Sequence, residues 1–219
     1  MSKKIKIEIW SDVMCPFCYI GKRRLEQALE IFPKKEEVEI EWKSFQLDPN
    51  TKSAPGKDAY TYLAERYGRD IEWSKAMHEN VTNMAAEVGL EYRFDKAKIA
   101  NSFDAHRLEH LAKKLGLGTK VVELIFAAYF TEGKDIADIE TLIEIGKAAG
   151  IDQQEIEKVF KGSDFGNAVR QDILEAQQLG VTGVPFFVFN RKYGISGAQP
   201  VAEFSRTLEQ VLSEAAAKE

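Results

Sequence analysis

Hydrophobic and polar residues alternate in two short segments near the start of the chain. In residues 5–10, IKIEIW, charged residues separate the isoleucines, and residues 38–47 repeat the pattern with glutamates between the apolar positions. A period of two is typical of a β-strand. Between these segments, apolar residues recur at helical spacing until Pro33, which ends the run. They are Ile20, Leu25, Ala28, Leu29 and Phe32. The pattern predicts a strand–helix–strand unit.

The middle and the end of the chain show different patterns. After a loop at residues 48–56, amphipathic segments such as VVELIFAAYF are separated by glycine-containing breaks and predict a run of helices. Near the end, residues 185–189 read as an apolar strand and residues 193–196 as its hairpin partner. A closing helix is expected from about Pro200 to Ala217.

The two ends of the chain complete one another. Together they supply β-α-β and β-β-α, which makes four strands with flanking helices, interrupted by an all-helical insertion. We therefore expect an α/β fold. Residues 1–54 and 165–219 are predicted to form the strand-containing domain, and residues 55–164 the insertion domain.

Composition and charge exclude several classes of function. The 219 residues are 44% hydrophobic and 30% charged, as in an ordinary globular protein, and the formal net charge is -5. No basic stripe is present, so no nucleic-acid partner is expected. The N-terminus lacks the apolar region of a signal peptide, and no run approaches the roughly 18 apolar residues of a membrane span. We expect a cytoplasmic protein with no membrane partner, in which a structural disulfide would be unusual.

The two cysteines, Cys15 and Cys18, lie at the predicted turn between the first strand and its helix. Their spacing fits a redox dithiol, half of a metal site, or an inert pair on one helix face. Zinc needs four ligands, and no second C-x-x-C is present, so no metal is expected. His106 and His110 lie opposite the apolar stripe of their segment, and we expect them to be solvated or to line a cleft. A C-x-x-C at the first strand–helix turn is the thioredoxin arrangement.

Four motifs resemble the FrnE-like branch of the DsbA-like thioredoxin-fold oxidoreductases. CPFCYIGK (15–22) resembles the active site of that branch and GVTGVP (180–185) its cis-proline loop, while NSFDAHRL (101–108) and AAYFTEGKDI (127–136) resemble its helical insertion. The resemblance covers nearly the whole chain. It implies a thioredoxin fold with a helical lid, and thiol–disulfide exchange with cysteine-containing proteins or low-molecular-weight thiols by a monomer or homodimer. No cofactor is expected beyond the redox-active disulfide, with glutathione as a candidate co-substrate.

The two cysteines have distinct expected roles. Exchange needs a thiolate, and the unpaired N–H groups of a helix N-terminus favour negative charge. Cys15 is therefore the expected attacking thiol, and Cys18, one turn further along the same face, the resolving thiol. Pro16 and Phe17 are expected to contact the substrate, and they lack the histidine of strongly oxidising DsbA-type sites. We expect a reduction potential between ~-120 and ~-270 mV, the values of DsbA and thioredoxin.

The resemblance also implies substrate-binding residues away from the dithiol. Pro185 is expected to follow a cis peptide bond and Val184 to present its backbone to a substrate chain; the alternative is a trans proline at the start of an edge strand. Asn101 can cap its helix or contact the substrate directly. Three aromatic residues are expected in the core of the insertion: Phe126, Tyr129 and Phe130.

Two other functions stay open. The related 2-hydroxychromene-2-carboxylate isomerases and kappa-class glutathione transferases share the fold and depend on glutathione, but they carry a serine where this chain has Cys15. Retention of both cysteines argues against that function, and also against a non-catalytic binding or chaperone module.

Overall fold

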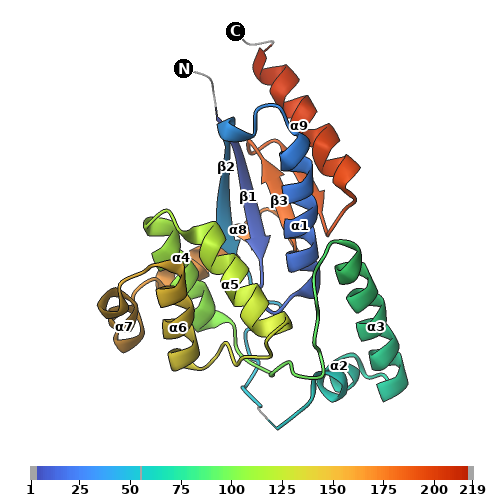
Figure 1. Cartoon of the computed structure of the whole chain (residues 1–219), viewed down its shortest axis with the longest axis vertical. Coiled ribbons are helices and arrows are strands. Elements are labelled where there is room, and N and C mark those ends of the chain that lie inside the picture. The colour runs from blue at the N-terminus through green and yellow to red at the C-terminus, as the bar shows by residue number, and fades with distance from the viewer. Residues whose placement is uncertain (1–3, 55, 217–219) are drawn as a thin grey trace.

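Four strands form one mixed sheet in the computed structural model, which describes residues 4–54 and 56–216 (Figure 1). The strand order is β2-β1-β3-β4; β1 runs parallel to β2 and antiparallel to β3, and β3 runs antiparallel to β4. The strands are β1 (Ile5–Ser11), β2 (Val38–Ser44), β3 (Phe186–Phe189) and β4 (Tyr193–Ser196). The two ends of the chain therefore build a single sheet, as the sequence predicts.

Two element boundaries differ from those predicted. The strand expected over residues 38–47 ends at Ser44, because the Leu47 N–H donates to the Asp12 carboxylate at 2.7 Å and the chain turns away from the sheet. Strand β3 begins one residue later than predicted. The predicted last residue of the closing helix, Ala217, lies outside the described residues.

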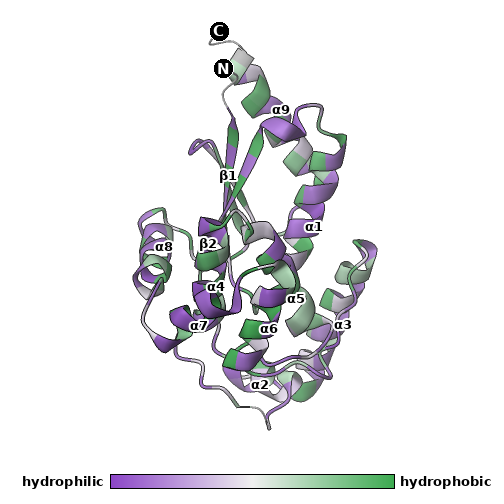
Figure 2. Ribbon diagram, turned by 60° about the vertical axis from the view of Figure 1, so that its left-hand side comes forward, coloured by the Kyte–Doolittle hydropathy of each residue, from purple (hydrophilic) through white to green (hydrophobic). Residues whose placement is uncertain are grey.

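Helices cover both faces of the sheet. Helices α1 (Pro16–Ile31) and α9 (Val201–Ala216) pack against one face, and α8 (Gly166–Gln178) against the other (Figure 1). Hydrophobic and hydrophilic residues alternate along β1 (Figure 2), but both faces of the strand are buried, and only Lys6 is partly exposed. Ile7 is buried in the main core with residues of α1 and α9, whereas Trp10 points the other way and packs with residues of α8.

A run of helices separates β2 from α8, as predicted. The helices are α2 (Ala59–Tyr67), α3 (Ile71–Glu87), α4 (Phe103–Lys114), α5 (Gly118–Phe130), α6 (Ile139–Ala149) and α7 (Gln153–Lys161). Aspartates cap the N-termini of α2, α3, α6 and α7; the Asp58 carboxylate, for example, accepts the Thr61 N–H. Gly68 and Gly150 end α2 and α6 in the left-handed conformation that glycine adopts without strain.

The predicted domain division stays a prediction. Its first boundary follows residue 54, and residue 55 lies outside the described part of the chain, as do residues 1–3 and 217–219. The second boundary, after residue 164, comes just before α8. Within the described residues, no helix is both long and apolar enough to cross a membrane.

Aromatic residues join the insertion to the start of α1. Tyr19, in the first turn of α1, stacks on Phe126 with ring centroids 4.8 Å apart, and Tyr92 stacks on Phe130 at 4.7 Å. Tyr129 meets Phe130 edge-on at 4.8 Å. Phe126, Tyr129 and Phe130 are all buried, which confirms the prediction for these aromatics. The cluster also holds the cysteine-bearing end of α1 against the insertion.

Candidate active site

Cys15 and Cys18 lie at the junction of β1 and α1. Cys15 immediately precedes the helix in an extended conformation, with φ -88° and ψ 112°, and Pro16 is the first helical residue. The Cys18 N–H donates to the Cys15 carbonyl at 3.0 Å, so the second thiol lies one turn along. Both residues are free thiols and are almost completely buried. The unpaired N–H groups of this helix terminus suit a sulfur that becomes negatively charged during exchange.

The loop before β3 brings a second predicted element to the dithiol. The Val184–Pro185 peptide bond is cis, as the resemblance implies. The Cys15 thiol donates a hydrogen bond to the Val184 carbonyl, with 3.4 Å between Sγ and the oxygen. Gly21 of α1 permits this approach, because a Cβ there would lie 3.1 Å from both Pro185 Cγ and Phe187 Cζ. Sequence reasoning did not single out Gly21, although a glycine within a helical segment is the signal that marks such a close contact.

The surroundings of Cys18 oppose its charged form. Burial raises the pKa of the Cys18 thiol well above its usual range, and the neighbouring Cys15 raises it further. The Ser11 hydroxyl and the Asp12 backbone N–H act in the opposite direction and lower the Cys18 pKa. The Ser11 hydroxyl is buried and has no other hydrogen-bond partner in the described residues, so its proton is available to the sulfur. No sequence pattern pointed to Ser11.

Asp12, also absent from the sequence-based predictions, ties the active-site turn to neighbouring segments. Its carboxylate accepts the Met14 N–H at 3.2 Å within the turn and the Leu47 N–H at 2.7 Å from the segment after β2. His106 of α4 lies on the same carboxylate, with Nε2 3.8 Å from Asp12 Oδ1. One side chain therefore links β1, the segment after β2 and the insertion.

His106 is a buried imidazolium. Its Nδ1 lies 2.8 Å from Glu109 Oε2, and its Nε2 lies 2.9 Å from the Phe45 carbonyl oxygen. Because a carboxylate and a carbonyl only accept hydrogen bonds, both ring nitrogens carry a proton. Burial alone would lower the pKa of His106, but the negative charges of Glu109 and Asp12 outweigh it and raise the pKa to about 10.

The prediction that His106 and His110 are solvated or line a cleft is wrong. His106 is completely buried, and His110 is nearly so, with its Nε2 3.1 Å from Asp172 Oδ2 and 3.2 Å from Ser44 Oγ. The two histidines lie opposite the apolar stripe of α4, as expected, but that face packs against β2 and α8. The two histidines on this face of α4 are therefore buried and lie within hydrogen-bond distance of acceptor oxygens. Neither histidine reaches the cavity beside Cys15.

Asn101 satisfies backbone groups at the start of α4. Its Oδ1 accepts the Phe103 N–H at 2.9 Å, and its Nδ2 donates to the Pro49 and Thr51 carbonyls at 3.1 and 3.0 Å. The N-cap position of α4 is occupied by Ser102, which makes no side-chain cap bond, so Asn101 accepts a first-turn N–H from one position earlier than a capping residue. The same amide holds the loop after β2 against the helix. The predicted contact between Asn101 and the substrate stays a prediction, since Asn101 does not line the cavity beside Cys15.

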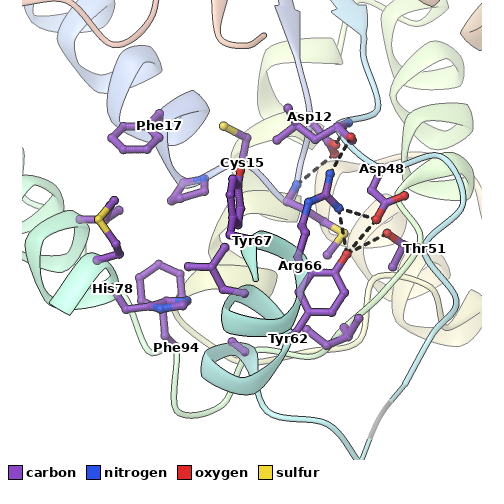
Figure 3. A pocket seen from close by; sticks show the side chains of 18 of the residues that line it. Asp12, Cys15, Phe17, Asp48, Thr51, Tyr62, Arg66, Tyr67, His78 and Phe94 are labelled. Carbon is purple, nitrogen blue, oxygen red and sulfur yellow. Dashed lines mark hydrogen bonds and ion pairs between the residues drawn. The ribbon is translucent and has the colours of Figure 1, made fainter. Parts of the chain in front are cut away.

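A cavity of about 360 Å³ opens beside Cys15 (Figure 3). Pro16 and Phe17 form part of its wall together with the loop after β2, helices α2 and α3, and residues of the insertion. Its lining is mainly apolar and includes aromatic side chains from separate segments, among them Phe17, Tyr67, Trp73 and Phe94. Its volume is typical of small-ligand pockets.

One wall of the cavity carries a set of polar groups that bind one another (Figure 3). The Tyr62 hydroxyl donates to Asp48 Oδ2 at 3.0 Å and lies 3.1 Å from Thr51 Oγ1. Arg66 pairs with the Asp48 carboxylate and donates to the Leu47 carbonyl at 3.0 Å. The charge of Arg66 is thus already balanced. In the part of the chain that the structure describes, no group of three or more His, Cys, Asp or Glu side chains could hold a metal ion.

Comparison with known proteins agrees with this geometry. A probable DsbA oxidoreductase from Streptomyces coelicolor, known from its crystal structure, is 40% identical, with a TM-score of 0.89 over 96% of this chain and 91% of that one. The uncharacterized protein YwbO of Bacillus subtilis is 27% identical over 186 residues, which are 84% of this chain and 86% of YwbO. The cytosolic disulfide reductase DsbM from Pseudomonas aeruginosa, also solved with GSH, is 18% identical and similar in fold, with a TM-score of 0.67 over 95% of this chain and 98% of DsbM. Residues 6–209 match the model of the DSBA-like thioredoxin domain, and the chain belongs to that family.

Proposed function

We propose that the protein is a thiol–disulfide oxidoreductase that works through Cys15 and Cys18. The observation that carries the proposal is the position of the Cys15 sulfur. It lies at the N-terminus of α1, contacts the Val184 carbonyl and lines the cavity, with a second thiol one turn away. Membership of a family that includes oxidoreductases supports the same reaction.

Cys15 begins the proposed reaction. Its thiolate attacks one sulfur of a substrate disulfide, the substrate S–S bond breaks, and the leaving sulfur departs as a thiolate that takes up a proton. A mixed disulfide then joins Cys15 to the substrate. The N–H groups at the start of α1 stabilise the charge on the attacking sulfur, and the Val184 carbonyl holds the thiol proton before attack.

Cys18 completes the reaction. It loses its proton and attacks the Cys15 sulfur, so that a disulfide forms between the two cysteines and the second substrate thiol is released. The substrate gains two electrons and two protons, and the dithiol loses them. The reverse sequence transfers the disulfide to a substrate dithiol. Because burial raises the Cys18 pKa, Cys18 stays protonated in the resting dithiol and Cys15 acts first.

The proposed substrates are disulfides or thiols of cysteine-containing proteins and of low-molecular-weight compounds. Pro16 and Phe17 lie on the cavity wall beside Cys15, so a group attached to the substrate sulfur meets them first. The backbone of Val184 lies within hydrogen-bond distance of the same sulfur. The redox-active disulfide is the only cofactor that this proposal needs.

Insulin reduction by dithiothreitol tests the proposal. Wild type should accelerate it, Cys15→Ser should be inactive, and Cys18→Ser should accumulate mixed disulfides that appear on non-reducing gels. The double variant controls for trapping that does not depend on Cys15. A wild type without activity toward any disulfide would overturn the function. Full turnover by Cys18→Ser without trapping would overturn the resolving role.

A glutathione-dependent isomerase or transferase is the second candidate. It is favoured by one observation, that DsbM, a protein of the same fold, has been solved with GSH. Such an activity would require glutathione and would survive Cys18→Ser, because glutathione would supply the second thiol. A chaperone or binding module would instead survive Cys15→Ser. Running each variant with and without glutathione separates the three functions.

A further inference from the structure

His78 of α3 lines the same cavity as Cys15 but takes no part in the sulfur chemistry (Figure 3). Its Nδ1 lies 2.8 Å from the Ser74 carbonyl oxygen. A carbonyl only accepts, so Nδ1 carries the ring proton. Burial lowers the pKa of His78 below its ordinary value, and the ring is therefore neutral near pH 7. The lone pair of Nε2 is left as a hydrogen-bond acceptor.

The His78 ring is held in one orientation. Phe94 meets it edge-on with centroids 4.5 Å apart, and Tyr60 packs on it at 4.8 Å. Together with the bond to Ser74, these contacts fix both the tautomer and the direction of Nε2. Among the described residues, Nε2 has no hydrogen-bond partner. A fixed acceptor without a partner is costly unless water or a ligand satisfies it.

A second polar group of the cavity also lacks a partner. Tyr129 is 5% exposed and lines the cavity, and its hydroxyl makes no hydrogen bond within residues 4–54 and 56–216. By contrast, Arg66 and Asp48 on the opposing polar wall satisfy each other. The cavity thus offers unpaired neutral groups and no unpaired cation to receive a carboxylate, which argues against an anionic ligand.

The remaining lining favours an aromatic ligand. Its rings come from separate segments and can contact a planar group from several sides, and aromatic pairs of this kind are stabilised beyond the burial of their area. Besides Tyr62, His78 and Tyr129, the aromatic lining residues are Phe17, Tyr67, Trp73 and Phe94. The volume of about 360 Å³ holds a phenol or indole ring together with the chain that links it to a sulfur.

We propose that His78 is a specificity-determining residue whose Nε2 accepts a hydrogen bond from an uncharged aromatic group that adjoins the disulfide attacked by Cys15. The hydrogen-bond donor is a phenolic hydroxyl or an indole N–H. Such a group belongs either to a tyrosine or tryptophan beside a substrate cysteine or to a low-molecular-weight aromatic disulfide. The inference rests on the proposed function, because it names the substrates that this function selects.

Paired symmetrical disulfides that differ by one hydroxyl on each half test the proposal and its source. One arm uses the disulfides of acetyl-Cys-Tyr-amide and acetyl-Cys-Phe-amide. The other uses bis[2-(4-hydroxyphenyl)ethyl] disulfide and bis(2-phenylethyl) disulfide. Reduced full-length protein should react about fivefold faster with the hydroxylated member, the value of one hydrogen bond. A preference in the first arm identifies a peptide substrate, and one in the second arm a small molecule. Equal rates in both arms overturn the proposal.

Two variants of His78 are matched to this test. In His78→Asn, the amide nitrogen takes the place of Nδ1 and keeps the bond to Ser74, but no acceptor reaches the cavity. In His78→Gln, the longer side chain returns an acceptor to the position of Nε2. The hydroxyl preference should vanish in the first variant and partly return in the second. The readout is the ratio of the two rates measured within one variant, so a general change in exchange rate does not affect it. A preference that survives His78→Asn overturns the role of His78.

Ligand binding separates this inference from the proposed function. In ¹⁵N-histidine NMR spectra, N-acetyltyrosinamide should shift the Nε2 resonance of His78, and N-acetylphenylalaninamide should not. If the shift occurs but the protein exchanges no disulfide, the binding site stands and the proposed function falls. If exchange proceeds without the shift and without a hydroxyl preference, the proposed function stands and this inference falls.

Discussion

Replacing His106 with glutamine should remove a contribution to the free energy of unfolding that varies with pH. The pKa of His106 is about 10 in the folded protein, against an ordinary value of 6.5. A group whose pKa rises on folding stabilises the folded state fully below its unfolded pKa, and this stabilisation is lost as the pH rises through the folded pKa. The contribution of His106 should therefore be complete at pH 6 and fall between about pH 6.5 and about pH 10.

The two pKa values set the size of the effect. A rise from 6.5 to about 10 corresponds to about 5 kcal/mol at 1.36 kcal/mol per pKa unit. That figure is an upper limit, because a neutral imidazole keeps one of its hydrogen bonds, to Glu109 or to the Phe45 carbonyl, and water can enter the site once the cation is gone. Between about pH 6.5 and about pH 10, we expect the unfolding free energy of wild type to fall by about 2–4 kcal/mol more than that of His106→Gln.

Urea unfolding measured at steps between pH 6 and pH 10 gives this difference, because titrating groups away from His106 contribute equally to both proteins. Glu109→Gln removes the largest influence that raises the His106 pKa in the folded protein. Its loss of stability should therefore still begin near the unfolded pKa of about 6.5, but it should end at a lower pH and be smaller. The double variant His106→Gln/Glu109→Gln controls for a carboxylate left without a cation. A difference between wild type and His106→Gln that stays constant with pH, or grows toward pH 10, would refute the assignment of His106 as a buried cation.

Three further substitutions test the surroundings of the dithiol. Phe17→His should raise the reduction potential toward the ~-120 mV of DsbA, because a histidine partner stabilises the reduced form. Equilibration against glutathione buffers measures this, and an unchanged or more reducing variant would show that the dipeptide does not set the potential. Ser11→Ala should lengthen the lifetime of the mixed disulfide by about tenfold, since the hydroxyl that lowers the raised pKa of Cys18 is lost; an unaltered lifetime in acid-quench experiments would contradict it. Tyr92→Phe should cost about 1 kcal/mol of unfolding free energy, because the Tyr92 hydroxyl donates to the Pro16 carbonyl at 2.6 Å. Equal stability of wild type and Tyr92→Phe in urea would show that this hydrogen bond does not stabilise the fold.

The sequence by itself determined the features that depend on near neighbours along the chain. The period of two in residues 5–10 and 38–47 predicts the parallel pair β1 and β2, and the helical spacing up to Pro33 predicts α1. These two predictions are enough to place Cys15 at a helix N-terminus, with Cys18 one turn away. The cis bond before Pro185 came from the resemblance rather than from any local pattern.

Only the tertiary structure decided what surrounds those residues. The contact between Cys15 and Val184 joins positions 169 residues apart, and the cavity that contains His78 forms where separate segments meet. The error for His106 shows the physical reason. Helical spacing identifies the apolar face of α4, but whether its polar face meets water or protein depends on how the insertion packs against the sheet. A charged group tolerates burial once acceptors surround it, and here Glu109 and the Phe45 carbonyl do so.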